Sequence, residues 1–153
     1  MIIPTVVTSR RAKLLKDKLF DVTWMHTNKE LELTSSPIRI PLFKGLLGLR
    51  LFFVRQAELS LFSNIESVEQ LKVPMVGQGD NWTDTRILQL NNFNLVTAMN
   101  TDSLMQMLLH SRFDYFPRSV LEIWSEKALQ LRCSCCRANS CALLSYCLVF
   151  FCG

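Results

Sequence analysis

The sequence predicts an α/β fold built on a parallel sheet, and three observations support that prediction. Short apolar runs rich in β-forming residues alternate along the chain with helical stretches of about ten residues, as in βαβ units. The loops between these runs are short and rich in glycine and helix-capping residues. The 153 residues are 49% hydrophobic and 20% charged, which is the composition of a folded domain.

Charge and hydropathy exclude several other classes of protein. The net charge is +4, from 17 Lys and Arg against 13 Asp and Glu, and no basic run is longer than Arg10-Arg11. A nucleic-acid partner is therefore not expected, because a phosphate track needs clustered bases. Residues 141–152 form the longest uncharged apolar stretch, which is shorter than the roughly 20 residues of a transmembrane helix. Residues 1–7 lack the basic region of a signal peptide, so none is expected.

The first third of the chain predicts irregularly placed elements. Residues 9–20 carry an apolar stripe at helical spacing and predict a short amphipathic helix, and residues 21–26 predict a strand. The TNKE sequence at 27–30 has the form of a capping box. Residues 37–41 must be extended, since each proline pushes its predecessor out of the helical region. Residues 49–54 are apolar, of strand length and rich in β-formers.

From residue 67 the pattern becomes regular. Residues 67–71 predict a short helical turn, and residues 73–76 a short strand. The GQGDN sequence at 77–81 predicts a turn-rich loop that opens a helix over 82–90.

The regular pattern continues to about residue 128. We expect a strand over 94–99, a helix over 101–112, a strand over 113–116 closed by Pro117, and a helix starting at Ser119. Strands and helices that alternate through short loops form right-handed βαβ units, and the strands of such units are parallel.

In this order the motifs resemble a known family. DVTW at 21–24 followed by TNKE, SVEQL at 67–71, VGQG at 76–79, and residues 101–115 with their leucines, Arg112 and Asp114 stand where that family has similar sequences. The chain up to its cysteines is similar to the type 2 periplasmic solute-binding proteins, specifically the family 3 or amino-acid-type extracellular solute-binding domain.

The resemblance implies a parallel-sheet lobe of a type 2 periplasmic-binding-protein-like fold, incomplete. Residues 1–54 would be the end of lobe one and the hinge strand, residues 55–132 lobe two, and residues 133–153 a tail outside the fold. The implied function is non-catalytic recognition of a small polar solute in an inter-lobe cleft, in the periplasm, with a membrane permease as partner. Lys29 stands where amino-acid binders have a carboxylate-clamping arginine, so that clamp is not expected.

The best candidate site is the loop after the strand that ends near residue 76. Glycines between a strand and a helix let backbone N–H groups point at an anion, and the helix dipole adds favourable potential. The alternative is that these are turn glycines beside an ordinary N-cap. The candidate ligand-binding residues here are Gly77, Gln78, Gly79, Asp80 and Trp82.

Three further candidates come from strand ends. Arg118 follows Pro117 at the end of a predicted parallel strand, where open α/β sheets place their ligand crevice, and its guanidinium could bind a carboxylate with two hydrogen bonds. Tyr115 lies on the same strand. Trp24, beside His26, could face the cleft from the other lobe. The alternatives are a solvated residue at a helix start for Arg118 and a half-buried strand aromatic for Trp24.

Enzyme chemistry is not predicted. His26 and His110 lack metal-ligand spacing, and neither lies beside a nucleophile in a recognisable motif. We expect no cofactor and no metal. An enzyme domain of similar fold is the third hypothesis.

Cysteine use changes abruptly after Arg132. All six cysteines follow it: Cys133, Cys135, Cys136, Cys141, Cys147 and Cys152. Structural zinc sites usually need two separated ligand pairs, and six cysteines allow 15 disulfide pairings, so neither role is specified. We interpret the segment as a tail unrelated to the fold. The alternative function is a stand-alone small α/β domain whose Cys-rich tail binds metal or associates with a membrane.

Overall fold

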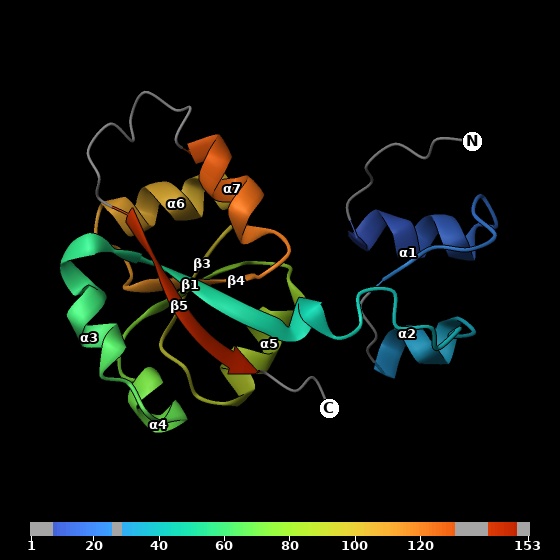
Figure 1. Ribbon diagram of the computed structural model, residues 1–153. Coiled ribbons are helices and arrows are strands. Elements are labelled where there is room, and N and C mark those ends of the chain that lie inside the picture. Colours follow the sequence, from blue (N-terminus) through green and yellow to red (C-terminus); the bar gives the residue numbers. More distant parts are fainter. Residues whose placement is uncertain (1–7, 26–28, 131–140, 150–153) are drawn as a thin grey trace. The chain divides into compact units, whose positions relative to one another are not determined.

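A computed structural model describes residues 8–25, 29–130 and 141–149 (Figure 1). The chain divides into two compact units, Met1–Pro41 and Leu42–Gly153. Each unit is described by itself below.

The first unit contains two helices and no strand among its described residues. They are α1 (Thr8–Lys16) and α2 (Lys29–Thr34). The predicted strand at 21–26 is wrong over residues 21–25, which are irregular, and His26 lies outside the described residues. A strand needs a neighbour to take its backbone hydrogen bonds, and none lies beside this segment in the described part of the unit. Residues 36–41 are non-helical, as their prolines predict.

The second unit contains a mixed sheet flanked by helices. Its first elements are η1 (Leu46–Gly48), β1 (Leu49–Arg55), η2 (Gln56–Glu58), α3 (Leu59–Ser63) and α4 (Val68–Leu71). Next come β2 (Val76–Gly79), α5 (Thr83–Leu90), β3 (Leu95–Ala98), α6 (Thr101–Leu109), β4 (Tyr115–Ser119), α7 (Ile123–Gln130) and β5 (Cys141–Val149). The order of strands and helices from residue 67 to residue 130 is the predicted one.

The strand order in the sheet is β3-β2-β4-β1-β5. β2 is parallel to both β3 and β4, so the predicted parallel arrangement is confirmed for these three strands. β1 runs antiparallel to β4 and to β5. The α/β fold class is therefore confirmed, with an antiparallel strand inserted at β1.

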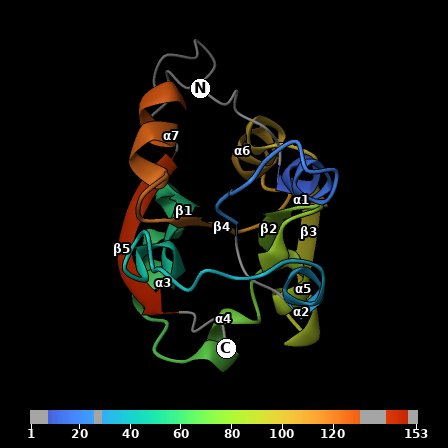
Figure 2. The same ribbon diagram turned by 90° about the vertical axis from the view of Figure 1, so that its right-hand side faces the viewer.

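Helices cover both faces of the sheet, and each face has its own apolar core. Phe62 of α3, Leu71 of α4 and Leu88 of α5 pack with Val76 and other residues on one face. The opposite face packs against α6 and α7, as Figures 1 and 2 show. Alternate residues of β1 and β4 enter the two cores, which fixes the face of every side chain along these strands.

Several element boundaries differ from the prediction. β2 covers Val76–Gly79 rather than residues 73–76, and α6 ends at Leu109 rather than at residue 112. β4 continues through Pro117 to Ser119, and α7 starts only at Ile123. β2 pairs with β4 at Val76 and Tyr115, and this pairing ends before Pro117. Proline lacks a backbone N–H, and it is tolerated here because no residue of β2 needs a hydrogen bond from position 117.

The cysteine-rich segment also differs from the prediction. Residues 141–149 form β5, which pairs antiparallel with β1, whereas the sequence analysis placed all of residues 133–153 outside the fold. β1 is apolar and would otherwise offer a free edge, and nine uncharged residues can satisfy that edge. Residues 131–140 and 150–153 lie outside the described part of the chain.

Candidate ligand-binding site

The sheet has a topological switch point between β2 and β4. From β2 the chain passes through α5 to β3 on one side, and then through α6 to β4 on the other side of β2. α5 and α6 pack on opposite faces of the sheet. α7, which follows β4, packs on the same face as α6, so the loops that leave the carboxyl ends of β2 and β4 diverge to opposite faces of the sheet. Open α/β sheets form their ligand crevice at such a point. Of the eight predicted site residues, Gln78, Gly79, Asp80, Trp82 and Arg118 lie along this edge, and Gly77 lies earlier in β2.

Gly77 and Gly79 lie inside β2, although the sequence analysis placed them in a loop. A Cβ on Gly77 would stand 2.3 Å from the Phe113 ring, and one on Gly79 would stand 2.4 Å from the Trp82 ring. These contacts explain why both positions are glycine, since any side chain would collide with an aromatic ring. Gly79 also places its carbonyl within 2.5 Å of the Thr85 hydroxyl, which donates to it.

Gln78 and Asp80 differ sharply in exposure. Gln78 is only 1% exposed, and its Oε1 has no hydrogen-bond donor among the described residues. Asp80 is exposed, and its backbone N–H donates to the Ala98 carbonyl at 3.0 Å. That bond holds the end of β2 beside the end of β3.

Trp82 and Arg118 come together from segments more than 30 residues apart in the sequence. The Arg118 guanidinium carbon lies 4.6 Å from the Trp82 ring centroid and 5.5 Å from that of Phe116. The two rings are stacked, with centroids 6.1 Å apart and planes at 22°. Trp82 thus packs between the Gly79 backbone and Arg118, and it remains partly exposed.

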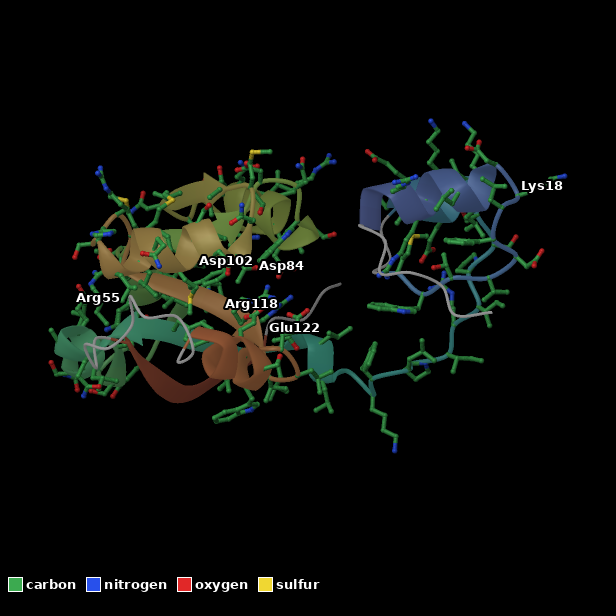
Figure 3. The ribbon with its side chains drawn as sticks, turned by 90° about the horizontal axis from the view of Figure 1, so that it is seen from above. Lys18, Arg55, Asp84, Asp102, Arg118 and Glu122 are labelled. Carbon is green, nitrogen blue, oxygen red and sulfur yellow. The ribbon has the colours of Figure 1, made fainter. Side chains whose placement is uncertain are left out.

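Arg118 is held by two carboxylates of α7 and its preceding turn. Its Nε and Nη2 donate to Glu126 at 2.8 and 2.5 Å, and Nη2 lies 3.0 Å from Glu122. Arg118 is 7% exposed, so the alternative of a solvated residue at a helix start is wrong. Figure 3 shows Arg118 and Glu122 at the same end of the unit as Asp84 and Asp102.

Sequence analysis missed a second arginine at this edge. Arg50 of β1 pairs with Asp84 in the first turn of α5 at 2.5 Å. The side chain of Arg50 shares its sheet face with Phe52 and Gln78, because Leu51 faces the opposite core. The signal that could have found it is a charge inside the apolar run LRLFFV, where burial requires an ionic partner.

Two predicted site residues lie elsewhere. Tyr115 is 1% exposed in the core, its hydroxyl donates to the Leu71 carbonyl at 3.1 Å, and burial first, then the charge of Asp114, raises its pKa above the ordinary range. Trp24 belongs to the first unit and is 49% exposed, with the Arg11 guanidinium 4.6 Å from its ring centroid.

The described residues contain no group of three or more His, Cys, Asp or Glu placed to hold a metal ion. Among the described helices, none is long and apolar enough to cross a membrane.

The second unit is an open α/β sheet with polar and charged side chains at the switch point between β2 and β4. The chain matches no family model and no curated protein. Three solved structures show what the chain is similar to. The periplasmic VFT2 domain of BvgS from Bordetella pertussis is 17% identical over 65% of this chain and 39% of its own, with a TM-score of 0.45.

An amino acid ABC transporter substrate-binding protein from Streptococcus pneumoniae, bound to L-arginine, is 12% identical over 67% of this chain, with a TM-score of 0.47. An ancestral cyclohexadienyl dehydratase is 13% identical over 94% of this chain and 56% of its own, with a TM-score of 0.43. The chain spans 39% of the length of the first two structures. The second carries the name of a substrate-binding protein, and the third that of an enzyme.

Proposed function

We propose that the second unit forms one wall of a solute-binding site and that the chain is part of a periplasmic solute-binding protein without catalytic activity. The observation that carries the proposal is the contact of Trp82 with Arg118 at the switch point of the sheet. Trp82 follows β2 and Arg118 ends β4, so the contact joins the two strands between which a crevice is expected.

The ligand is a small polar solute. The edge offers one partly exposed aromatic ring, two ion-paired arginines and exposed carboxylates such as Asp80, which suit a polar molecule rather than a lipid. In the intact protein the opposite wall closes over the solute by a hinge movement, and a membrane permease receives it.

Affinity of the chain alone is expected to be low. One wall supplies only part of the contacts. Millimolar binding already requires a favourable binding free energy of about 4 kcal/mol after the cost of ordering the ligand and the side chains is subtracted. We therefore expect dissociation constants on the order of 1 mM or weaker.

The three tryptophans provide the test. The chain has only Trp24, Trp82 and Trp124, and each indole N–H gives its own NMR signal. We expect titration with amino acids to about 10 mM to shift the Trp82 signal and to leave that of Trp124, which is 56% exposed on α7, in place. The variant Trp124→Ala should bind as the native chain does, and Trp82→Ala should bind more weakly.

Two results would overturn the proposal. One is the absence of any shift at Trp82 with every solute tested. The other is binding that Trp82→Ala leaves unchanged, because the solute would then occupy another place.

A further inference from the structure

The first unit has many exposed apolar side chains and no buried one among its described residues. α1, α2 and the segments that follow them contain only exposed or half-buried side chains there. Six large apolar side chains are between 49% and 86% exposed: Leu19, Val22, Trp24, Leu33, Ile38 and Ile40. Exposed apolar side chains in such number on a short segment mark a surface that contacts a protein or a membrane.

Basic residues are concentrated in the same unit. No basic run exceeds Arg10-Arg11, yet residues 8–25 hold five bases against the two acids Asp17 and Asp21, a net charge of +3. The whole chain has a net charge of +4, so this segment carries most of it. The five bases are Arg10, Arg11, Lys13, Lys16 and Lys18, of which all but the half-buried Arg11 are exposed.

The fold of this segment brings apolar side chains beside the bases. The Arg11 guanidinium lies 4.6 Å from the centroid of the Trp24 ring, and its Nη1 donates to the Trp24 carbonyl at 3.4 Å. The Leu19 N–H donates to the Leu14 carbonyl at 2.9 Å, which turns the chain back at the end of α1. We call the five bases together with Leu19, Val22 and Trp24 the α1 patch.

An anionic lipid surface fits the α1 patch better than a protein or a nucleic acid does. Lysine is depleted at protein interfaces, whereas three of the five bases here are lysines. A nucleic-acid backbone would satisfy the bases but would leave Leu19 and Val22 exposed to water. At an anionic bilayer the bases lie at the headgroups while apolar side chains enter the acyl boundary, and tryptophan is favoured at that depth.

We propose that the α1 patch binds the surface of a membrane that contains anionic lipids. α1 lies along the surface, its bases contact lipid phosphates, and Leu19, Val22 and Trp24 enter the boundary between headgroups and acyl chains. The patch belongs to the first unit and the proposed solute site to the second, so the inference goes beyond the proposed function and does not depend on it.

Co-sedimentation of the full chain with lipid vesicles tests the role of charge. The probes are vesicles of phosphatidylcholine alone and vesicles in which about a third of the lipid is phosphatidylglycerol. We expect the partition coefficient to be about a hundredfold larger for the anionic vesicles, because each net positive charge near such a surface contributes about a factor of five. Added salt should reduce this ratio by screening.

Two triple variants with the same loss of charge show where the contact lies. Lys13→Gln, Lys16→Gln and Lys18→Gln together should lower the partition coefficient for anionic vesicles by about a hundredfold. Lys44→Gln, Lys72→Gln and Arg112→Gln remove three bases from the second unit and should lower it by less than about threefold, since these bases lie outside the patch.

The tryptophans report which side chain enters the bilayer. Lipids that carry bromine on their acyl chains quench the fluorescence of an indole that reaches them. We expect such vesicles to quench the native chain, Trp82→Phe and Trp124→Phe, and to lose this effect with Trp24→Phe. Trp124 is 56% exposed on α7, so it is a matched control for exposure alone.

Four outcomes would overturn the inference. They are equal partition into neutral and anionic vesicles, equal weakening by the two triple variants, quenching that Trp24→Phe leaves unchanged, and tighter binding to a single-stranded oligonucleotide than to anionic vesicles. The last would make a nucleic acid the partner of the α1 patch. None of these results bears on the solute titration followed at Trp82, so failure of one proposal leaves the other standing.

Discussion

The two ends of the sheet each bury an arginine in the second unit, and the two arginines are held in different ways. At the amino end of β4, Arg55 donates from Nη1 to the Leu108 and Phe113 carbonyls at 2.7 and 2.5 Å, and it also pairs with Glu58 and with Asp114. At the carboxyl end, the guanidinium of Arg118 pairs with side-chain carboxylates and lies over two aromatic rings, and among the described residues it has no backbone acceptor. Figure 3 shows Arg55 and Arg118 at opposite ends of the unit.

Because their partners differ, Arg55 makes a structural contact, whereas the ion pairs of Arg118 are contacts that a ligand can replace. Backbone carbonyls at the end of α6 and before β4 cannot leave Arg55 unless those elements move. Asp114 adds to this by accepting the backbone N–H of Met75 at 2.7 Å, which ties β2 to β4. The carboxylates of Glu122 and Glu126 can rotate away from Arg118 at much smaller cost.

Replacing each arginine gives the largest expected effect. Arg55→Met should lower the free energy of unfolding by about 3–5 kcal/mol, because it strips buried carbonyls and two carboxylates of their donor. Arg118→Met should cost about 2 kcal/mol, since Glu126 loses its partner yet can turn toward water. Urea unfolding followed by circular dichroism measures both.

Lys72→Met serves as the control, because its ion pair with the exposed Glu69 should contribute less than about 1 kcal/mol. Equal losses for Arg55→Met and Arg118→Met would contradict the comparison. A second variant, Arg118→Met with Glu126→Gln, should recover part of the stability, because the more buried of the two carboxylates that pair with Arg118 is then neutral.

The sequence predicts the elements of the second unit well and their ends less well. Apolar runs at strand and helix spacing identify β1, β3 and α6, whereas the strand predicted at 73–76 overlaps β2 only at Val76. The helical turn predicted at 67–71 forms as α4, with a capping box of Ser67 and Gln70 that was not predicted. Element ends depend on tertiary pairing, which local sequence does not contain. For this reason β4 extends past Pro117.

The sequence predicts where the candidate site lies in the fold, but it does not predict which side chains contact one another there. The loop after β2 and the end of β4 do lie at one edge, as parallel strands require. The partners of Arg118, the pairing of Arg50 with Asp84 and the core position of Tyr115 depend on which side chains meet across the fold. None of these follows from spacing along the chain.

The first unit shows the limit of local patterns. Its predicted helix appears as α1, whereas the strand predicted at 21–26 does not form over 21–25. Leu19, Val22 and Ile38 are each more than 60% exposed. Local propensity is a weak determinant of strand structure when no neighbouring strand packs against the segment.

Gly77 and Gly79 of β2 allow a second comparison, in which the expected losses of stability are smaller than those for the two arginines. Gly77 faces the ring of Phe113, which is 1% exposed, while Gly79 faces Trp82, which lies partly exposed at the start of α5. Gly77→Ala should therefore cost about 1–3 kcal/mol through overpacking, and Gly79→Ala should cost less because the Trp82 ring can move outward.

Thermal or urea unfolding of the two alanine variants measures the difference. Gly79→Ala should in addition shift the Trp82 indole signal, and adding Trp82→Ala should remove most of its cost. A larger loss for Gly79→Ala than for Gly77→Ala would show that the carboxyl end is the more rigid one.

Tyr115 gives the smallest expected effect and the one that depends on pH. Its pKa is raised from 10.0 in the folded chain, by burial and then by Asp114, so the folded state favours the neutral phenol. Stability should be independent of this group below about pH 10 and should fall as the pH rises above it, by up to about 1.4 kcal/mol per pH unit, because only the unfolded chain readily releases the proton.

Tyr115→Phe should cost about 1 kcal/mol at neutral pH, since the buried Leu71 carbonyl loses the donor that lies 3.1 Å away. The same variant should flatten the fall in stability above pH 10, which urea unfolding between pH 7 and about pH 11 measures. A native slope in Tyr115→Phe would mean that the hydroxyl ionises as easily in the folded chain as in the unfolded one, and that the amino end of the sheet admits water.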